Sequence, residues 1–337
     1  MNRKKALLIA GGGTLGGYTA SELLKRGWAV DVILLEKRTS LLPALRYFTA
    51  RADDALLRKL FAENRYDVIV DFIHYADPAA YRARADLLLE NTDQLIFLSS
   101  YRVYANEETP VRETSPLLLD VVTDRDFLEH ETYAVPKTKN ERYLRSTGRK
   151  NFTVVRPLIS FSRYRLDLVC TGAPLLLLRK KEGKPVLLPA EAKDLSAGVG
   201  WAGNIGKMFA ALAGNEKALG ETFTLGTDEN PTWGEVAEYY NELMGIETVW
   251  VDTGIYEKTL TDRFFLRYDR LFDRRIDNAK LREATGLSRE DFTGVREGIL
   301  RELYTLGERP EELPDFITPA AREASALSDA YLSGRTV

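Results

Sequence analysis

Short apolar runs alternate with longer amphipathic stretches through the first half of the chain. The runs of strand length cover residues 4–10, 29–36, 66–73, 94–100 and 151–160. Between them, leucine and aromatic residues recur at helical spacing over residues 14–27, 52–65, 78–91 and 135–148. Strands that alternate with helices predict a parallel sheet, and strands that are apolar throughout indicate helices on both faces. We therefore expect an α/β fold built on a Rossmann-type, doubly wound parallel sheet.

The second half of the chain is less regular. Residues 201–215 and 232–245 have helical spacing, and residues 222–226 form a short apolar run between them. This mixture predicts a second, smaller domain of mixed α/β structure.

The composition is that of a globular protein with a large core. The 337 residues are 45% hydrophobic and 29% charged, with a net charge of −3, and the length suggests two domains. Because this balance provides no concentrated basic face, we expect no nucleic-acid partner. No run reaches the roughly 18 apolar residues of a membrane span, so no membrane association is expected. Cys170 is the single cysteine, which excludes a disulfide within one chain and favours a cytoplasmic location.

Soft metal ligands are too few for a convincing cluster. The chain has two histidines, His74 and His130, besides the single cysteine. We therefore expect no bound metal, and we expect structural roles for both histidines.

A glycine-rich turn joins the first predicted strand to the first predicted helix. Residues 11–17 are GGGTLGG, in which Gly11, Gly13 and Gly16 have the spacing Gly-x-Gly-x-x-Gly. Between a buried strand and a helix, this spacing is typical of a dinucleotide-binding βαβ unit. Small residues let the backbone approach a pyrophosphate, and the helix N-terminus offers free N–H groups to it. We therefore expect a dinucleotide cofactor at this turn.

The position of the turn suggests a role for each predicted domain. The dinucleotide-binding domain is expected to span residues 1–157 plus about 196–226. The substrate-binding domain is expected to comprise about 158–195 and 227–312. Residues 313–337 are weakly patterned, and we expect them to form a C-terminal arm or tail.

The end of the second predicted strand carries charges of both signs, at the place where such folds contact the cofactor ribose. Glu36 could accept hydrogen bonds from a 2′-hydroxyl group, which favours NAD. Lys37 and Arg38 could neutralise a 2′-phosphate, which favours NADP. We expect NAD, with NADP as the alternative.

Three polar side chains occur in an order that suits acid–base chemistry. Ser99–Tyr104 (SSYRVY) follows the apolar run at 94–98, at the carboxyl end of a strand, where open α/β folds bind ligands. Tyr133 and Lys137 are four residues apart and share one helix face. A phenol is a poor base at neutral pH, but a nearby ammonium favours its ionised form. A hydroxyl such as that of Ser100 could hold the substrate oxygen beside it.

These motifs resemble those of the extended short-chain dehydrogenase/reductases, the NAD-dependent epimerase/dehydratase family. The motifs are the glycine turn, Ser-Ser-x-x-Val-Tyr, Tyr-x-x-x-Lys followed four residues later by Glu141, and the Arg-Pro pair of VVRPL. The resemblance covers roughly residues 5–300. It implies that Ser100 and Tyr133 are catalytic, and that Lys137 modulates the tyrosine and holds the nicotinamide ribose.

The resemblance also implies binding residues and an assembly. Cofactor contacts are expected from Gly11, Gly13, Thr14, Leu15, Gly16, Glu36, Arg38, Phe72 and Lys137. Substrate contacts are expected from Ser100, Tyr101 and Arg274. Basic and aromatic residues interleave over residues 263–275, which favours an anionic substrate pocket or a solvated face over nucleic-acid binding. A homodimer is expected to pack through the helices that include Tyr133 and residues 78–91.

The chain departs from the family pattern at several positions. Ala10 stands where the first glycine is usual, and Ala50 where an aspartate commonly reads the adenine. Ala105 and Asn204 replace a usual glycine and a usual aspartate. Pro136 lacks an N–H group and fits only the first turn of a helix, so the Tyr-x-x-x-Lys motif must lie at a helix start.

Two classes of function follow from these residues. The first is an NAD(P)-dependent oxidoreductase or epimerase that modifies a nucleotide-activated sugar by hydride transfer, assisted by Tyr133. Tyr101 and Arg102 stand where the 4,6-dehydratase branch carries Asp-Glu, which argues against sugar dehydration by that route. The alternative is a non-catalytic dinucleotide-binding protein of an RNA-binding or redox-sensing type. The set of Ser100, Tyr133 and Lys137 argues against this alternative, because a binding module has no need for it.

Overall fold

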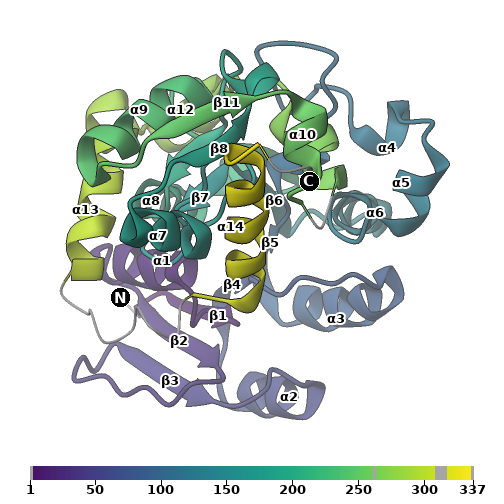
Figure 1. Cartoon of the computed structure of the whole chain (residues 1–337). Helices are drawn as coiled ribbons and strands as arrows, with labels where there is room; N and C mark the ends of the chain where they lie inside the picture. The colour runs from purple at the N-terminus through teal and green to yellow at the C-terminus, as the bar shows by residue number, and fades with distance from the viewer. Residues whose placement is uncertain (1–2, 261–262, 308–316, 335–337) are drawn as a thin grey trace.

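A seven-stranded parallel sheet forms the centre of the computed structural model, which describes residues 3–260, 263–307 and 317–334 (Figure 1). The strand order is β10-β6-β5-β4-β1-β2-β3, and every neighbouring pair is parallel. The strands are β1 (Lys5–Ile9), β2 (Ala29–Leu34), β3 (Leu45–Thr49), β4 (Tyr66–Asp71), β5 (Thr92–Leu98), β6 (Phe152–Pro157) and β10 (Glu221–Leu225). The predicted α/β, doubly wound parallel sheet is therefore confirmed.

Helices cover both faces of this sheet because its strands are apolar on both sides. Along β1, Leu7 and Ile9 contribute to one buried cluster, and Ala6 and Leu8 contribute to another. The first cluster packs beneath α2 (Asp54–Glu63), α3 (Pro78–Glu90) and α6 (Ala134–Ser146). The second packs beneath α1 (Thr14–Lys25), α8 (Ala202–Leu212) and α12 (Ala279–Thr285).

The strand order reverses between β1 and β4, next to the glycine turn. The chain runs outward from β1 through β2 to β3 on one side, and from β4 through β5 to β6 on the other. Ligands of open α/β sheets bind outside the carboxyl ends of the strands at such a reversal. The fold therefore places a binding cleft above Ile9 and Asp71, which are paired at the ends of β1 and β4.

Two strand predictions differ from the structure. The run predicted as one strand over 151–160 is divided, because after Pro157 the chain leaves the sheet and β7 (Ile159–Phe161) pairs with β9 (Val199–Trp201). Strand β3 has no counterpart in the predictions. Its residues are half-buried or exposed at the edge of the sheet, so they lack the apolar run that marks the other strands.

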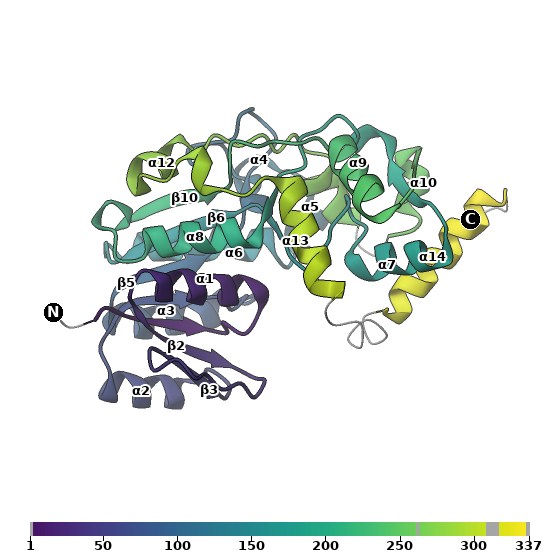
Figure 2. The same ribbon diagram turned by 90° about the vertical axis from the view of Figure 1, so that its left-hand side faces the viewer.

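Most of the remaining elements form a smaller unit beside the carboxyl edge of the sheet (Figure 2). It contains β8 (Val186–Pro189) paired with β11 (Thr248–Val251), and the helices α7 (Ala173–Glu182), α9 (Trp233–Met244), α10 (Thr253–Glu257) and α13 (Val295–Gly307). Trp233 is buried in the apolar cluster of this unit. This arrangement is the predicted smaller unit of mixed α/β structure.

The C-terminal segment contains a helix that the weak sequence pattern did not predict. Helix α14 (Pro319–Leu332) packs on α7, and Figure 2 shows it at the periphery of the molecule. Arg179 of α7 is buried and pairs with Asp329 of α14 at 2.5 Å. Of the predicted arm at 313–337, residues 313–316 and 335–337 lie outside the described residues. Across the described ranges, every helix is too short or too polar to cross a membrane.

Candidate active site

Close backbone packing explains the glycines of the turn between β1 and α1. A Cβ atom on Gly16 would lie 2.4 Å from the carbonyl oxygen of Gly11, so a side chain there would push the helix away from the turn. A Cβ atom on Gly13 would meet nothing within 4 Å, because this face of the turn borders a cavity. Gly13 is also the N-cap of α1 and provides no side-chain cap, which leaves the first N–H groups of the helix for a ligand. The turn therefore fits a dinucleotide pyrophosphate.

Ala10 lies in a backbone region that favours glycine. Its φ angle is +54°, and it borders the cavities on both sides of the turn. A left-handed conformation costs a non-glycine residue about 1–2 kcal/mol. The sequence departs from the family pattern here, but the backbone keeps the glycine-like conformation.

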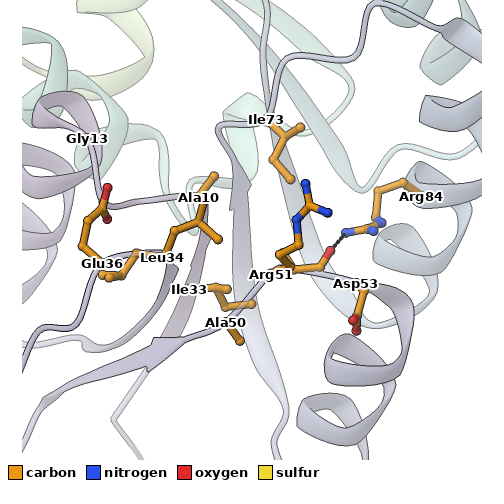
Figure 3. A pocket seen from close by; sticks show the side chains of 13 residues that line it. Ala10, Gly13, Ile33, Leu34, Glu36, Ala50, Arg51, Asp53, Ile73 and Arg84 are labelled. Atoms are coloured by element: carbon orange, nitrogen blue, oxygen red, sulfur yellow. Dashed lines mark hydrogen bonds between the residues drawn. The ribbon is translucent and has the colours of Figure 1, made fainter.

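A cavity of about 490 Å³ lies on the β2 side of the turn (Figure 3). Glu36 lies on one side of it, and Arg51 and Arg84 lie on the other. The Glu36 carboxylate is close to the turn, since a Cβ atom on Gly12 would lie 2.9 Å from its Oε2. Arg38 is exposed and does not line this cavity. No motif marked Arg51, although it follows Ala50 directly in the chain.

A larger cavity of about 600 Å³ lies on the other side of the turn, above the carboxyl ends of β5 and β6. Many of the predicted site residues meet on its walls: Gly13, Thr14, Leu15, Gly16, Phe72, Ser100, Tyr101 and Tyr133. Gly11, Lys137 and Arg274 are not on these walls. The structure therefore brings the predicted cofactor turn, the serine and the tyrosine to one cavity.

Tyr133 and Lys137 lie at the start of α6, as Pro136 required. Tyr133 is the N-cap, and Pro136 occupies the first turn, where its missing N–H group leaves no hydrogen bond broken. The Lys137 ammonium is buried, donates a hydrogen bond to the carbonyl of Leu98, and lies 5.8 Å from the centre of the Tyr133 ring. Burial lowers the pKa of Lys137 to about 8, although Asp71 and Glu141 act in the opposite direction.

A buried ion pair fixes α6 against the sheet. Arg156 of β6 binds the Glu141 carboxylate through two hydrogen bonds, of 2.6 and 3.0 Å, and both side chains are almost fully buried. Ser99 donates a further hydrogen bond to Glu141. Because Glu141 lies one turn after Lys137, this pair sets the position of Lys137 relative to Ser100.

Two side chains contact the Tyr133 ring. The His74 ring lies 5.0 Å from it, centre to centre, and the guanidinium of Arg102 lies 4.9 Å from it. His74 also hydrogen-bonds the carbonyl of Thr132 at 2.9 Å, and burial lowers the pKa of His74. His130 is exposed and pairs with Asp126 at 3.0 Å, away from the cavity walls.

Three arginines border the larger cavity, Arg102, Arg165 and Arg270, whereas the predicted Arg274 does not. Arg274 is buried, with hydrogen bonds to the carbonyl of Tyr104 and to Asp269. Arg270 borders the cavity and donates a hydrogen bond of 2.9 Å to the Tyr101 hydroxyl. The interleaved basic and aromatic residues at 263–275 were the signal for this wall, but they did not distinguish one arginine from another.

A strained loop helps to hold Arg270. Its Nε donates a hydrogen bond of 2.9 Å to the carbonyl of Val169, whose φ angle is +54°. A β-branched residue in this conformation is strained, and such strain persists only where the surrounding structure imposes it.

Comparison with known proteins identifies the family. The sequence matches the model of the NAD dependent epimerase/dehydratase family over residues 7–195, more than half of the chain. The chain belongs to this family. NAD is the cofactor of the NAD-dependent epimerase/dehydratases, as the glycine turn indicated. No curated protein matches the sequence.

Solved structures of similar fold include epimerases. An epimerase from Methanothermobacter thermautotrophicus has a TM-score of 0.70 at 17% identity, over 93% of this chain and 95% of its own. A UDP-glucose 4-epimerase from Thermotoga maritima, solved with UDP-glucose, has a TM-score of 0.64 at 16% identity, over 90% and 99%. The Bordetella bronchiseptica enzyme WbmH, solved with NAD⁺, has a TM-score of 0.66 at 17% identity, over 91% and 99%. At these identities, the likeness establishes the fold alone.

Proposed function

We propose that this protein oxidises a hydroxyl-bearing carbon of a nucleotide-activated sugar, as an NAD-dependent epimerase or dehydrogenase. One observation carries the proposal: Ser100 and Tyr133 line the same cavity as the uncapped start of α1. The nicotinamide of NAD, when bound, accepts a hydride from the sugar carbon and can return it. Gly13 and the N–H groups of Thr14 and Leu15 would hold its pyrophosphate.

The proton of the reacting hydroxyl passes to Tyr133. A phenol becomes a useful base when a positive charge favours its ionised form, and Lys137 is the buried ammonium nearest to it in α6. Ser100 borders the same cavity, and its hydroxyl donates to the substrate oxygen and orients it. The backbone N–H group of Arg102 donates a hydrogen bond of 3.2 Å to the side-chain oxygen of Ser100. The hydroxyl proton of Ser100 is therefore left for the substrate.

The chemistry of the cavity walls favours hydride transfer over dehydration. Loss of water from the sugar needs an acid to expel the hydroxyl group. Within the described residues, no carboxylate lines this cavity, and Tyr101 and Arg102 occupy the positions of the dehydratase Asp-Glu pair. The cavity thus favours a reaction that moves one hydride and one proton.

The positive charge of the cavity supports a nucleotide-activated sugar as substrate. Arg102 and Arg165 line the cavity and keep part of their side chains exposed, so they suit the phosphates of such a molecule, whereas Arg270 is buried and paired with Asp269. The UDP-glucose bound by the Thermotoga maritima epimerase is a ligand of this class.

A tyrosine variant with a matched control tests the proposal. NAD released from the denatured protein is quantified, and conversion of UDP-sugars is followed by chromatography. Tyr133→Phe should lower kcat by about 10²–10⁴, as expected for loss of a general base, while NAD content stays unchanged. Tyr304→Phe removes an exposed hydroxyl from α13 and should leave kcat unchanged. Undiminished turnover in Tyr133→Phe, or binding of NAD without turnover of any nucleotide sugar, would contradict the proposal and favour a non-catalytic binding protein.

We also propose that the protein is a homodimer. Helices α3 and α6 pack side by side on one face of the sheet (Figure 1), and family resemblance is what suggests that they meet a second copy. Light scattering after size-exclusion chromatography should give twice the mass of 38.0 kDa. A monomer at micromolar concentration would refute the dimer.

A further inference from the structure

Glu302 of α13 is a buried carboxylate that accepts hydrogen bonds from three separate segments of the chain. Its exposed fraction is 2%. One oxygen accepts hydrogen bonds of 2.6 Å from the Tyr18 hydroxyl and from the Trp201 indole, and the other accepts one of 2.8 Å from the backbone N–H of Arg163. The ion pairs described for α13 do not include Glu302. Because a buried charge is costly unless it is well hydrogen-bonded, these three donors stabilise the carboxylate.

Two of the donors orient the carboxylate against α1. Tyr18 lies one turn after Thr14, which lines the larger cavity beside the glycine turn. The Tyr18 ring packs edge-on against Trp201, with 5.3 Å between the ring centres. Burial and the hydrogen bond to Glu302 raise the pKa of Tyr18, so its hydroxyl keeps the proton that it donates. Gly298, one turn before Glu302, lets α13 come close, because a Cβ atom there would lie 2.8 Å from the Cβ of Trp201.

The third donor belongs to a tight turn on the wall of the larger cavity. Ser162 and Arg165 close this turn with two backbone hydrogen bonds, of 2.8 and 3.0 Å. Tyr164 and Arg165 line the cavity, and the Arg165 side chain is half-exposed. Arg163 is not on the wall, and its N–H group is directed to Glu302. The carboxylate therefore holds the turn from behind the wall that carries Arg165.

We propose that Glu302 is a positioning residue for substrate binding, which holds the turn 162–165 so that Arg165 meets the phosphates of the nucleotide. The inference rests on the proposed function, because it takes the substrate to be a nucleotide-activated sugar. Glu302 does not line the cavity, so it acts through the backbone of the turn and not by contact with the ligand. Loss of this contact frees the turn and weakens substrate binding, while the glycine turn and the affinity for NAD are unaffected.

An isosteric substitution at Glu302 tests the inference. In Glu302→Gln, the one remaining acceptor oxygen serves the two side-chain donors, and the amide group then faces the N–H of Arg163, which breaks that hydrogen bond. UDP, dTDP and GDP are titrated by calorimetry into the NAD-loaded wild type, and the one that binds most tightly serves as the probe. Its Kd should rise about tenfold in Glu302→Gln, as expected for loss of one charge-assisted hydrogen bond, while NAD content stays unchanged.

Two further measurements distinguish positioning from general stability. Tyr18→Phe removes one donor from the same carboxylate but keeps the contact with the turn, so it should change the Kd of the probe less than about threefold. With a nucleotide sugar that the protein converts, Glu302→Gln should raise KM about tenfold and change kcat less than about threefold.

A pair of variants at Arg163 tests the same contact without changing Glu302. Arg163→Pro removes the N–H group, and Arg163→Ala removes the side chain but keeps the N–H. The φ angle of Arg163 is negative, as proline requires, and proline is favoured at the second position of a four-residue turn. Only the proline variant should weaken binding of the probe. In an Arg165→Met background, Glu302→Gln should have little further effect on the Kd, because its effect passes through Arg165.

The outcomes separate this inference from the proposed function. Failure of the wild type to bind any of the three nucleoside diphosphates overturns both. If one of them binds, an unchanged Kd in Glu302→Gln or in Arg163→Pro overturns the positioning role and leaves the proposed function standing. The positioning role is also overturned if Tyr18→Phe weakens binding as much as Glu302→Gln, or if Glu302→Gln keeps its full effect in the Arg165→Met background.

Discussion

Lys137 carries a charge that the fold keeps away from water. Its ordinary pKa of 10.5 falls to about 8 in the folded protein because of burial. In the unfolded chain it binds its proton more tightly, so the folded state is destabilised wherever the lysine is charged. This cost is complete below pH 8 and is relieved as the pH rises from about 8 to 10.5.

Replacing Lys137 by methionine should remove this pH dependence. The free energy of unfolding of the wild type, relative to that of Lys137→Met, should rise by about 3 kcal/mol between pH 8 and 10.5, since a shift of one pKa unit corresponds to 1.36 kcal/mol. Urea denaturation of the cofactor-free proteins measures this difference in the free energy of unfolding. The contribution of the tyrosines cancels in it, because both proteins contain the same tyrosines. A difference that stays constant with pH would show that Lys137 is not the group that titrates.

Two glycines of one turn should respond differently to the same added methyl group. Gly13→Ala has space for its Cβ, so the free energy of unfolding should change by less than about 1 kcal/mol. The affinity for NAD should fall at least tenfold, because the methyl group enters the space proposed for the pyrophosphate. Gly16→Ala must displace the backbone of Gly11 and should destabilise the protein by about 2 kcal/mol or more. Thermal denaturation and NAD titration of both variants provide the comparison. Similar NAD affinity in Gly13→Ala and the wild type would mean that this face of the turn does not meet the cofactor.

At the scale of the elements, the position of α6 on the sheet depends on one buried ion pair. Arg156→Met would leave the Glu141 carboxylate buried without its cation, at a cost of about 3–5 kcal/mol. The double variant Glu141→Leu/Arg156→Met should recover part of this loss. A double-mutant cycle in urea measures the coupling, and additive effects would show that the pair contributes no interaction of its own.

The sequence predicted the elements whose hydrophobic pattern is complete. Buried strands such as β4 and β5 contain short apolar runs, at residues 68–70 and 95–98, and the glycine turn has a fixed spacing. Strand β3 and helix α14 were missed because each is stabilised by its neighbour rather than by its own pattern. The walls of the site were harder still, since no motif marked Arg51 and the basic and aromatic pattern at 263–275 did not distinguish Arg270 from Arg274. Which of several arginines faces a cavity depends on packing between distant parts of the chain.

At the scale of the whole molecule, cofactor binding should stabilise the fold and discriminate between the two dinucleotides. The Glu36 carboxylate lies beside the turn, where it would accept hydrogen bonds from a ribose hydroxyl and repel a phosphate. At a hundred times its Kd, NAD should add about 2.7 kcal/mol of stability, and the same concentration of NADP should add less. Differential scanning fluorimetry with each dinucleotide measures the two stabilisations. Glu36→Gln should reduce the difference between the stabilisation by NAD and the stabilisation by NADP. Greater stabilisation by NADP would indicate that Arg51 binds the 2′-phosphate.

The strand order has a consequence for how the chain folds during synthesis. Six strands of the sheet are complete once residue 157 has emerged, but β10 joins the outer edge of β6 only after residue 225. Until then, the nascent chain presents β6 as an open edge that can pair with another polypeptide. The hydrogen bond between Tyr101 and Arg270 spans 169 positions in the sequence, so the substrate wall forms later still. The cofactor turn therefore leaves the ribosome well before the residues that complete the substrate wall.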